Sequence, residues 1–254
     1  SAYGNTVCET PNIDRLAARG VRFDNAYTPC PICSPARVGL MTGNLPSRHD
    51  CYDNTSVLAS DAPTVSHYLA MAGYETVLSG KMHFVGPDQL HGFTRRIMPD
   101  IHGRGGNWRM MANWDPDVES PLRGDSALPS AAIEAHAGEH PHMHYDEEVA
   151  RKAEIYLAEP ARHEQPWALC ASLFTPHFPF VVREPYFSNY YPEHTKLPDL
   201  PEGDVEGLHP QNRRFRDFWL RGDLPEDEIL RSRGAYYGLV EFCDHQIGRI
   251  LDAL

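Results

Sequence analysis

Helical patterns alternate with short apolar runs along this chain, and that alternation constrains the fold more than any other feature. Helices are predicted where apolar residues recur every three or four positions, and strands where short apolar-rich segments lie between them, most clearly in the apolar run at 167–174. The pattern predicts helices over 11–20, 34–43, 63–73, 145–159 and 225–254, and strands over 21–23, 74–79 and 167–174. Such alternation favours an α/β fold with a mostly parallel central sheet flanked by helices.

Two proline-rich stretches interrupt this pattern. Residues 86–144 and 175–224 have little periodicity, and the chain contains 22 prolines in 254 residues. Because periodic segments surround both stretches, we expect long ordered loops rather than disorder. We find no internal repeat.

Charge and hydropathy exclude several classes of protein. The 23 basic residues are outnumbered by 35 acidic residues, which gives a net charge of −12 and argues against a nucleic-acid-binding surface. The mean hydropathy is −0.48, and no apolar run approaches the roughly 18–20 residues of a membrane span. The six cysteines do not form a dense disulfide framework. We expect a chain outside the membrane, with a cytoplasmic location favoured over a periplasmic one.

Polar groups follow the predicted strands where a parallel α/β sheet binds its ligands. Lys81 and His83 come directly after the strand at 74–79, and His177 follows the strand at 167–174. Ligands of such sheets bind at the carboxyl ends of the strands. We therefore expect these side chains to approach one another.

The segment from Cys33 to Gly43 carries the clearest chemical signal. Cys33 is predicted immediately before a helix, with Ser34 as the cap and Pro35 in the first turn. Unpaired backbone N–H groups at a helix start attract an anion. Arg37, one turn along, can form a forked hydrogen bond with an oxyanion. A nucleophile, an anion site and a cation thus occur within five residues.

This segment resembles the first signature of the type I sulfatases, which belong to the alkaline-phosphatase-like superfamily. The similar residues are Cys-Ser-Pro-Ala-Arg at 33–37 and Leu-Met-Thr-Gly at 40–43, and a second signature is present at 73–83. The opening at 3–16 is also similar. Residues 45–48, 52–54 and 79–93 most resemble choline-sulfatase-type enzymes.

The resemblance implies that Cys33 is oxidised to formylglycine. A formylglycine-generating enzyme or an anaerobic maturation enzyme would carry out this step. The aldehyde hydrate would attack sulfur with one hydroxyl and release sulfate with the help of the other. The implied cofactor is a divalent cation, expected to be calcium, which Cys33 as formylglycine would help to bind. The implied substrate is a small-molecule sulfate ester.

The resemblance also assigns roles to the other candidate residues. Arg37 would stabilise the diol, and Lys81 and His83 would hold sulfate oxygens. His177 would hold an oxygen or protonate the leaving group, and Asn54 would be a neutral donor near the sulfate. Each candidate also has a purely structural alternative. Lys81 could be a solvated lysine and His83 a structural histidine. His177 could be only a loop residue, and Asn54 only a turn residue.

The same resemblance predicts that residues 1–254 form part of one sulfatase catalytic domain. The expected missing parts are the first strand and the C-terminal part, together with most metal ligands. We therefore expect this fragment alone to be inactive. A homo-oligomer is an open expectation.

Competing functions remain at this stage. One is a phosphonate monoester or phosphodiester hydrolase that also uses formylglycine. Another is a thiol redox or zinc-binding module built on Cys30 and Cys33, and a third is a fragment that only binds anions. Trp108 and Trp114 offer rings for a choline cage, but we interpret them as residues of the core or of a pocket wall. We interpret the His140, His142 and His144 series as a structural or surface loop.

Overall fold

A computed structural model describes residues 1–102, 134–159, 165–199, 207–220 and 224–254. These residues divide into two compact units. The described parts of the first unit are 1–20, 134–143, 175–199, 207–220 and 224–247, and those of the second unit are 21–102, 144–159, 165–174 and 248–254.

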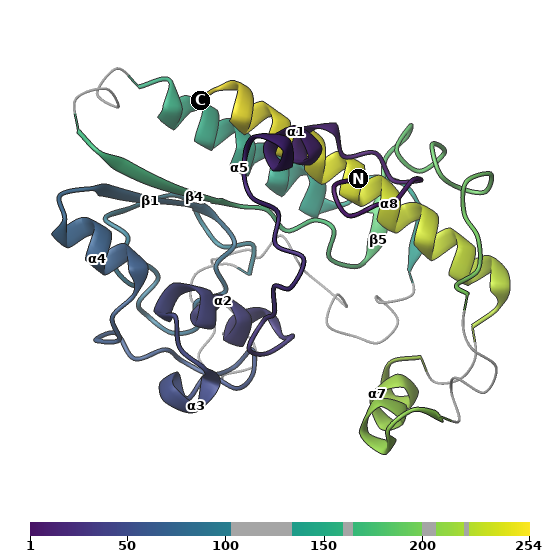
Figure 1. The fold of residues 1–254 in the computed structure, drawn as a ribbon, viewed down its shortest axis with the longest axis horizontal. Coiled ribbons are helices and arrows are strands. Elements are labelled where there is room, and N and C mark those ends of the chain that lie inside the picture. The colour runs from purple at the N-terminus through teal and green to yellow at the C-terminus, as the bar shows by residue number, and fades with distance from the viewer. Residues whose placement is uncertain (103–133, 160–164, 200–206, 221–223) are drawn as a thin grey trace. The chain divides into compact units, whose positions relative to one another are not determined.

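The second unit is built on a parallel sheet with strand order β2-β1-β4, and Figure 1 shows β1 and β4 side by side. β1 (Glu75–Gly80) is the central strand, and it pairs in parallel with β2 (Arg95–Met98) and β4 (Trp167–Ser172). Its middle residues, Val77 and Leu78, are completely buried. A central parallel strand is covered on both faces, which explains why every residue of β1 after Glu75 is buried, including the polar Thr76 and Ser79.

Helices pack around this sheet. They are α2 (Cys33–Thr42), α3 (Pro46–His49), α4 (Val65–Met71) and the part of α5 (Pro141–Leu157) from His144 onward. Thr64 and His67 form a reciprocal capping box at the start of α4. Met41 of α2 shares a core cluster with Leu78 of β1. A hydrogen bond from Arg37 to the carbonyl oxygen of Lys81 places the first turns of α2 near the carboxyl end of β1.

The first unit contains a parallel pair of strands, β3 (Ala135–Ala137) and β5 (Phe180–Val182). Its helices are α1 (Pro11–Arg19), α7 (Pro210–Leu220) and α8 (Glu226–Asp252), the last as far as Ile247. The buried Asp244 carboxylate accepts hydrogen bonds from the backbone N–H groups of Asn12 and Ile13. A carboxylate in this position caps the positive end of α1.

The predicted α/β class with parallel strands is confirmed, while three local predictions are wrong. Residues 21–23 form no strand, and Val21 and Phe23 are 78% and 68% exposed. The stretch 86–144 contains β2 and β3 as well as loop, and 175–224 contains β5 and α7. Within the described residues, no helix has the length and apolar character needed to cross a membrane.

Candidate active site

The carboxyl end of β1 turns sharply at Gly80. Gly80 has φ +100°, and a Cβ atom there would collide with the carbonyl oxygen of Ser172 on β4. The same carbonyl accepts the backbone N–H of Lys81 at 3.0 Å. A residue without a side chain is therefore required for β1 and β4 to approach closely just before Lys81.

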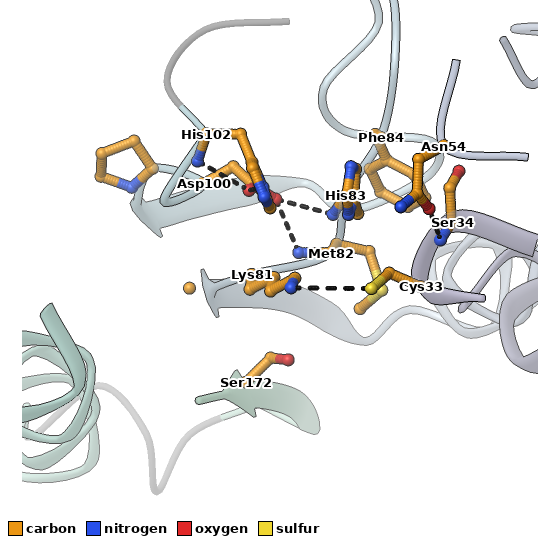
Figure 2. A network of polar contacts seen from close by, with 12 residues as sticks. Cys33, Ser34, Asn54, Lys81, Met82, His83, Phe84, Asp100, His102 and Ser172 are labelled. Carbon is orange, nitrogen blue, oxygen red and sulfur yellow. Dashed lines mark hydrogen bonds and ion pairs between the residues drawn. The ribbon is translucent and has the colours of Figure 1, made fainter. Parts of the chain in front are cut away.

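Lys81 points from this turn toward Cys33 (Figure 2). Its Nζ lies 4.0 Å from the Cys33 Sγ and 4.6 Å from the centre of the Phe174 ring. The residue is only 2% exposed, and in the described residues no carboxylate forms an ion pair with it. Burial lowers the pKa of Lys81. An anion bound beside Cys33 would supply the counter-charge that this ammonium lacks.

Cys33 is the first residue of α2 rather than the residue before the helix. Ile32 occupies the N-cap position with an extended backbone, and no side chain of its own caps the helix. Ser34, the predicted cap, is buried, and its backbone N–H donates to Asn54 Oδ1 at 2.9 Å. Asn54 thus caps α2 from a distant loop, in place of Ser34. The predicted site residues Cys33 and Asn54 lie together at this helix start.

Arg37 connects α2 to the strand ends. Its Nη1 donates to the carbonyl oxygen of Lys81 and to Ser172 Oγ, each at 2.8 Å. The guanidinium is therefore fixed by the ends of both β1 and β4. Its positive charge acts on both Lys81 and His83, so these three predicted residues share one electrostatic environment.

His83 is held in an unusual backbone conformation with φ +58°. It is 1% exposed, and neither ring nitrogen has a hydrogen-bond partner among the described residues. Burial lowers its pKa to about 2, and the neighbouring charges of Lys81 and Arg37 act in the same direction. Buried polar nitrogens are normally satisfied. An imidazole with two unsatisfied nitrogens is therefore a candidate ligand-binding group.

Asp100 and His102 were not predicted from the sequence, yet they adjoin His83. Asp100 Oδ2 accepts the backbone N–H groups of Met82 and His83 at 2.8 and 2.7 Å. Asp100 Oδ1 accepts His102 Nδ1 at 2.9 Å, and the His102 ring stacks on His83 (Figure 2). The sequence analysis does not predict β2 as a strand. With β2 recognised, the Asp-x-His pattern that follows it would place Asp100 and His102 at the same edge of the sheet as Lys81.

His177 belongs to the first unit, so its predicted role at the site stays a prediction. Its Nδ1 lies 2.6 Å from the carbonyl oxygen of Phe178, to which it can donate. His142 and His144 lie in α5, where His142 is buried and contacts the Val181 carbonyl oxygen through Nε2. Trp108 and Trp114 lie outside the described residues.

The site has no complete set of metal ligands in the described part of the chain. There, no three His, Cys, Asp or Glu side chains are grouped so that they could hold a metal ion. The side chains around Cys33 are instead cationic or neutral, and they suit an anion. Cys30 and Cys33 are both free thiols.

A nucleophile-bearing helix start, two cations and an imidazole unsatisfied among the described residues thus lie at the carboxyl end of a parallel sheet, an arrangement that suits an anionic ligand. The family comparison makes this specific, because residues 1–254 match the Sulfatase family model along their whole length. The chain belongs to the sulfatase family.

Individual relatives agree with this assignment. The chain is 36% identical to the choline-sulfatase of Rhizobium meliloti (strain 1021), over 96% of the chain and 49% of the relative. It is 28% identical to an arylsulfatase of Clostridium perfringens (strain 13 / Type A), over 99% of the chain and 55% of the relative. The chain thus spans about half the length of the curated relatives it matches.

A solved structure confirms the fold. The phosphonate monoester hydrolase of Agrobacterium radiobacter superposes with a TM-score of 0.72 at 25% sequence identity, over 100% of this chain and 56% of that structure. The alkaline-phosphatase-like α/β fold predicted from the signatures is therefore correct. The family match also favours the ester hydrolase over the thiol module on Cys30 and Cys33.

Proposed function

We propose that the protein containing this chain hydrolyses sulfate monoesters, with the residue at position 33 as the nucleophile. The observation that carries the proposal is the approach of Lys81 Nζ to within 4.0 Å of the Cys33 Sγ, in a buried setting with no carboxylate partner among the described residues. A desolvated ammonium beside the nucleophile interacts strongly with a transferring sulfuryl group.

The modification at position 33 is part of the proposal and rests on the family. A formylglycine made from Cys33, by a formylglycine-generating or anaerobic maturation enzyme, supplies a geminal diol as the nucleophile. The Cys33 side chain is half-buried in the folded chain.

The remaining side chains bind and orient the substrate. Lys81 donates to a sulfate oxygen, and a His83 imidazole that is neutral at pH 7 donates one N–H to another. Arg37, fixed by Lys81 O and Ser172 Oγ, places its charge beside the nucleophile. Asn54 caps α2 with its carbonyl oxygen and offers its amide N–H groups toward the anion. His177 is proposed to protonate the leaving oxygen or to bind a sulfate oxygen.

The divalent cation is also a proposal. The described residues do not form a cation site by themselves. Position 33 would be one ligand, and the other ligands would come from residues beyond the described ones. When bound, the cation would polarise the sulfate.

The similarity in fold to a phosphonate monoester hydrolase supports phosphonate monoesters as an alternative substrate class. Lysine and arginine bind sulfate and phosphonate alike, so the described residues do not by themselves select one. The relatives named as sulfatases favour the sulfate ester. Because one relative is named a choline-sulfatase, the test substrates should include choline sulfate as well as aryl, alkyl and sugar sulfates.

The test uses the full-length protein expressed with a maturation enzyme. Tryptic digestion releases residues 23–37 as one peptide, and its mass reports whether Cys33 has lost its thiol in favour of an aldehyde. Hydrolysis of a matched aryl sulfate and aryl phosphonate is then measured. We expect the modified mass, a preference for the sulfate, and a loss of at least about 10³-fold in kcat for Cys33→Ala.

Cys30→Ala is the matched control, because it removes a neighbouring thiol without touching the site. It should retain activity and the aldehyde at position 33, measured as the same mass change from the unmodified form of its own 23–37 peptide. A preference for the phosphonate would move the protein to the alternative class. Full activity in Cys33→Ala would refute the proposed nucleophile.

A further inference from the structure

Asp100 is a buried carboxylate that the proposed chemistry does not use. It is 3% exposed, and its Oδ2 accepts Met82 N–H, His83 N–H and Arg96 Nη2, the last at 3.3 Å. Its Oδ1 accepts both the backbone N–H and Nδ1 of His102, at 3.2 and 2.9 Å. Burial alone would raise the pKa of Asp100, but the hydrogen bond from His102 and the charge of Arg96 outweigh it and hold this pKa well below its usual range.

The backbone hydrogen bonds of Asp100 act on a strained turn. His83 has φ +58°, a conformation that costs a residue with a side chain about 1–2 kcal/mol. Two consecutive N–H groups that donate to one carboxylate oxygen fix the path of the chain through Met82 and His83. Because Lys81 precedes this pair directly, the same carboxylate also fixes where the lysine leaves β1.

The His102 ring acts on the His83 side chain. The two ring centres are 4.1 Å apart and the planes differ by 28°. Since neither His83 nitrogen has a hydrogen-bond partner among the described residues, hydrogen bonding does not orient the His83 ring there. Packing must do so, and His102 is held in place by Asp100. We propose that Asp100 and His102 are positioning residues, which hold the His83 imidazole in the orientation that a sulfate oxygen requires.

This inference rests on the proposed function, since it assigns His83 as an oxyanion ligand. Small errors in the position of a catalytic group are costly: a misplacement of about 1 Å can lower the rate about 10²-fold. A purely structural network would instead affect stability and leave the rate of the folded enzyme unchanged. The two roles can therefore be separated by experiment.

Two substitutions of His102 separate ring packing from hydrogen bonding. His102→Phe keeps an aromatic ring against His83 and loses the side-chain donor to Asp100. His102→Asn keeps a donor to Asp100 and loses the ring. With the full-length, matured protein and an aryl sulfate, we expect His102→Asn to lower kcat about 10–100-fold with little change in KM, because His83 is misoriented in the transition state. His102→Phe keeps the ring but loses the hydrogen bond that holds it, so it should lose less of the wild-type kcat than His102→Asn does.

Asp100→Asn is a more disruptive substitution. It replaces an acceptor oxygen by an amide N–H group among five donors, and it can therefore prevent folding. Glu148→Gln is the matched control for the loss of a carboxylate. Glu148 pairs with Arg151 on the exposed face of α5, and its substitution should leave kcat unchanged. Equal kcat values for His102→Asn and the wild type would overturn the inference, as would equal losses for the Asn and Phe variants.

A second measurement does not depend on turnover. Histidine-selective isotope labelling gives an NMR signal for the His83 ring, assigned by its absence in His83→Gln. We expect this signal to shift or broaden in His102→Asn and to stay close to its wild-type position in His102→Phe. An unchanged signal in His102→Asn overturns the positioning role. If instead the signal responds as expected but no sulfate ester is hydrolysed, the failure lies with the proposed function alone.

Discussion

Asn54 illustrates how one side chain can serve both the fold and the site. It lies 20 residues from Ser34 in sequence, yet its Oδ1 accepts the Ser34 backbone N–H and satisfies one of the unpaired donors at the start of α2. The helix start that bears Cys33 is therefore anchored by a loop residue. The family signature predicted Asn54 as a substrate donor, but the capping contact depends on tertiary structure and no local pattern predicts it.

Two substitutions of Asn54 should separate its role as a helix cap from its proposed role as a substrate donor. Asn54→Ala removes the cap, and we expect it to lower the free energy of unfolding by about 1 kcal/mol. Asn54→Asp keeps an acceptor and should be nearly neutral for stability. It also places a negative charge near the bound anion, so KM for an aryl sulfate should rise at least about tenfold. Chemical denaturation and steady-state kinetics of the full-length protein measure both effects, and an unchanged KM in Asn54→Asp would place Asn54 away from the substrate.

At the scale of elements, the junction of β1 and β4 depends on Gly80. Gly80→Ala adds a methyl group against the Ser172 carbonyl oxygen at a positive φ. We expect a loss of about 1–2 kcal/mol from the backbone conformation and about 1–3 kcal/mol more from the collision. Denaturation midpoints, converted to free energies of unfolding, measure the sum.

Gly73→Ala is the matched control for Gly80→Ala. Gly73 has φ +87°, and a Cβ atom there would meet nothing within 4 Å. Its substitution should therefore cost only the backbone contribution. Equal losses for the two variants would show that the close approach of β1 to β4 does not limit the fold.

The elements that sequence analysis predicted well are those with a strong local signal. β1 follows the helix-ending Gly73, and α2 and α4 begin within two residues of Pro35 and Pro63, the prolines that predicted them. β2 was missed because its first residues are Arg95 and Arg96. Arg96 donates to the Gly80 carbonyl oxygen and to Asp100, contacts that exist only in the folded sheet. Asp100 and His102 follow β2, so they were missed with it.

The strand predicted at 21–23 was wrong for a related reason. Val21, Arg22 and Phe23 have the apolar alternation of a strand, but a strand also needs a partner. These residues pair with no other strand in the described parts of the chain, and the two apolar side chains are exposed. Alternation predicts only that a segment suits a sheet.

For the whole molecule, buried neutral histidines link stability to pH. Burial, assisted by the neighbouring charge of His140, lowers the pKa of His142 to about 3, whereas an unfolded histidine has a pKa of about 6.5. Between these values the unfolded chain binds a proton that the folded chain does not. The free energy of unfolding therefore falls as pH decreases below about 6.5, by up to about 1.4 kcal/mol per pH unit for each such group.

His142→Gln should reduce this slope, because glutamine carries no titrating group and its amide can still donate to the Val181 carbonyl oxygen that His142 Nε2 contacts. Urea denaturation of wild type and variant at pH 7, 6 and 5 measures it. At pH 7 the change in the free energy of unfolding caused by the substitution should be small. At pH 5 the free energy of unfolding of the variant should be higher relative to that of the wild type than it is at pH 7. His144→Gln on the same helix is the control for the loss of an exposed histidine, since the His144 side chain is 64% exposed. A His142→Gln variant with the wild-type slope would mean that folding does not lower the pKa of His142.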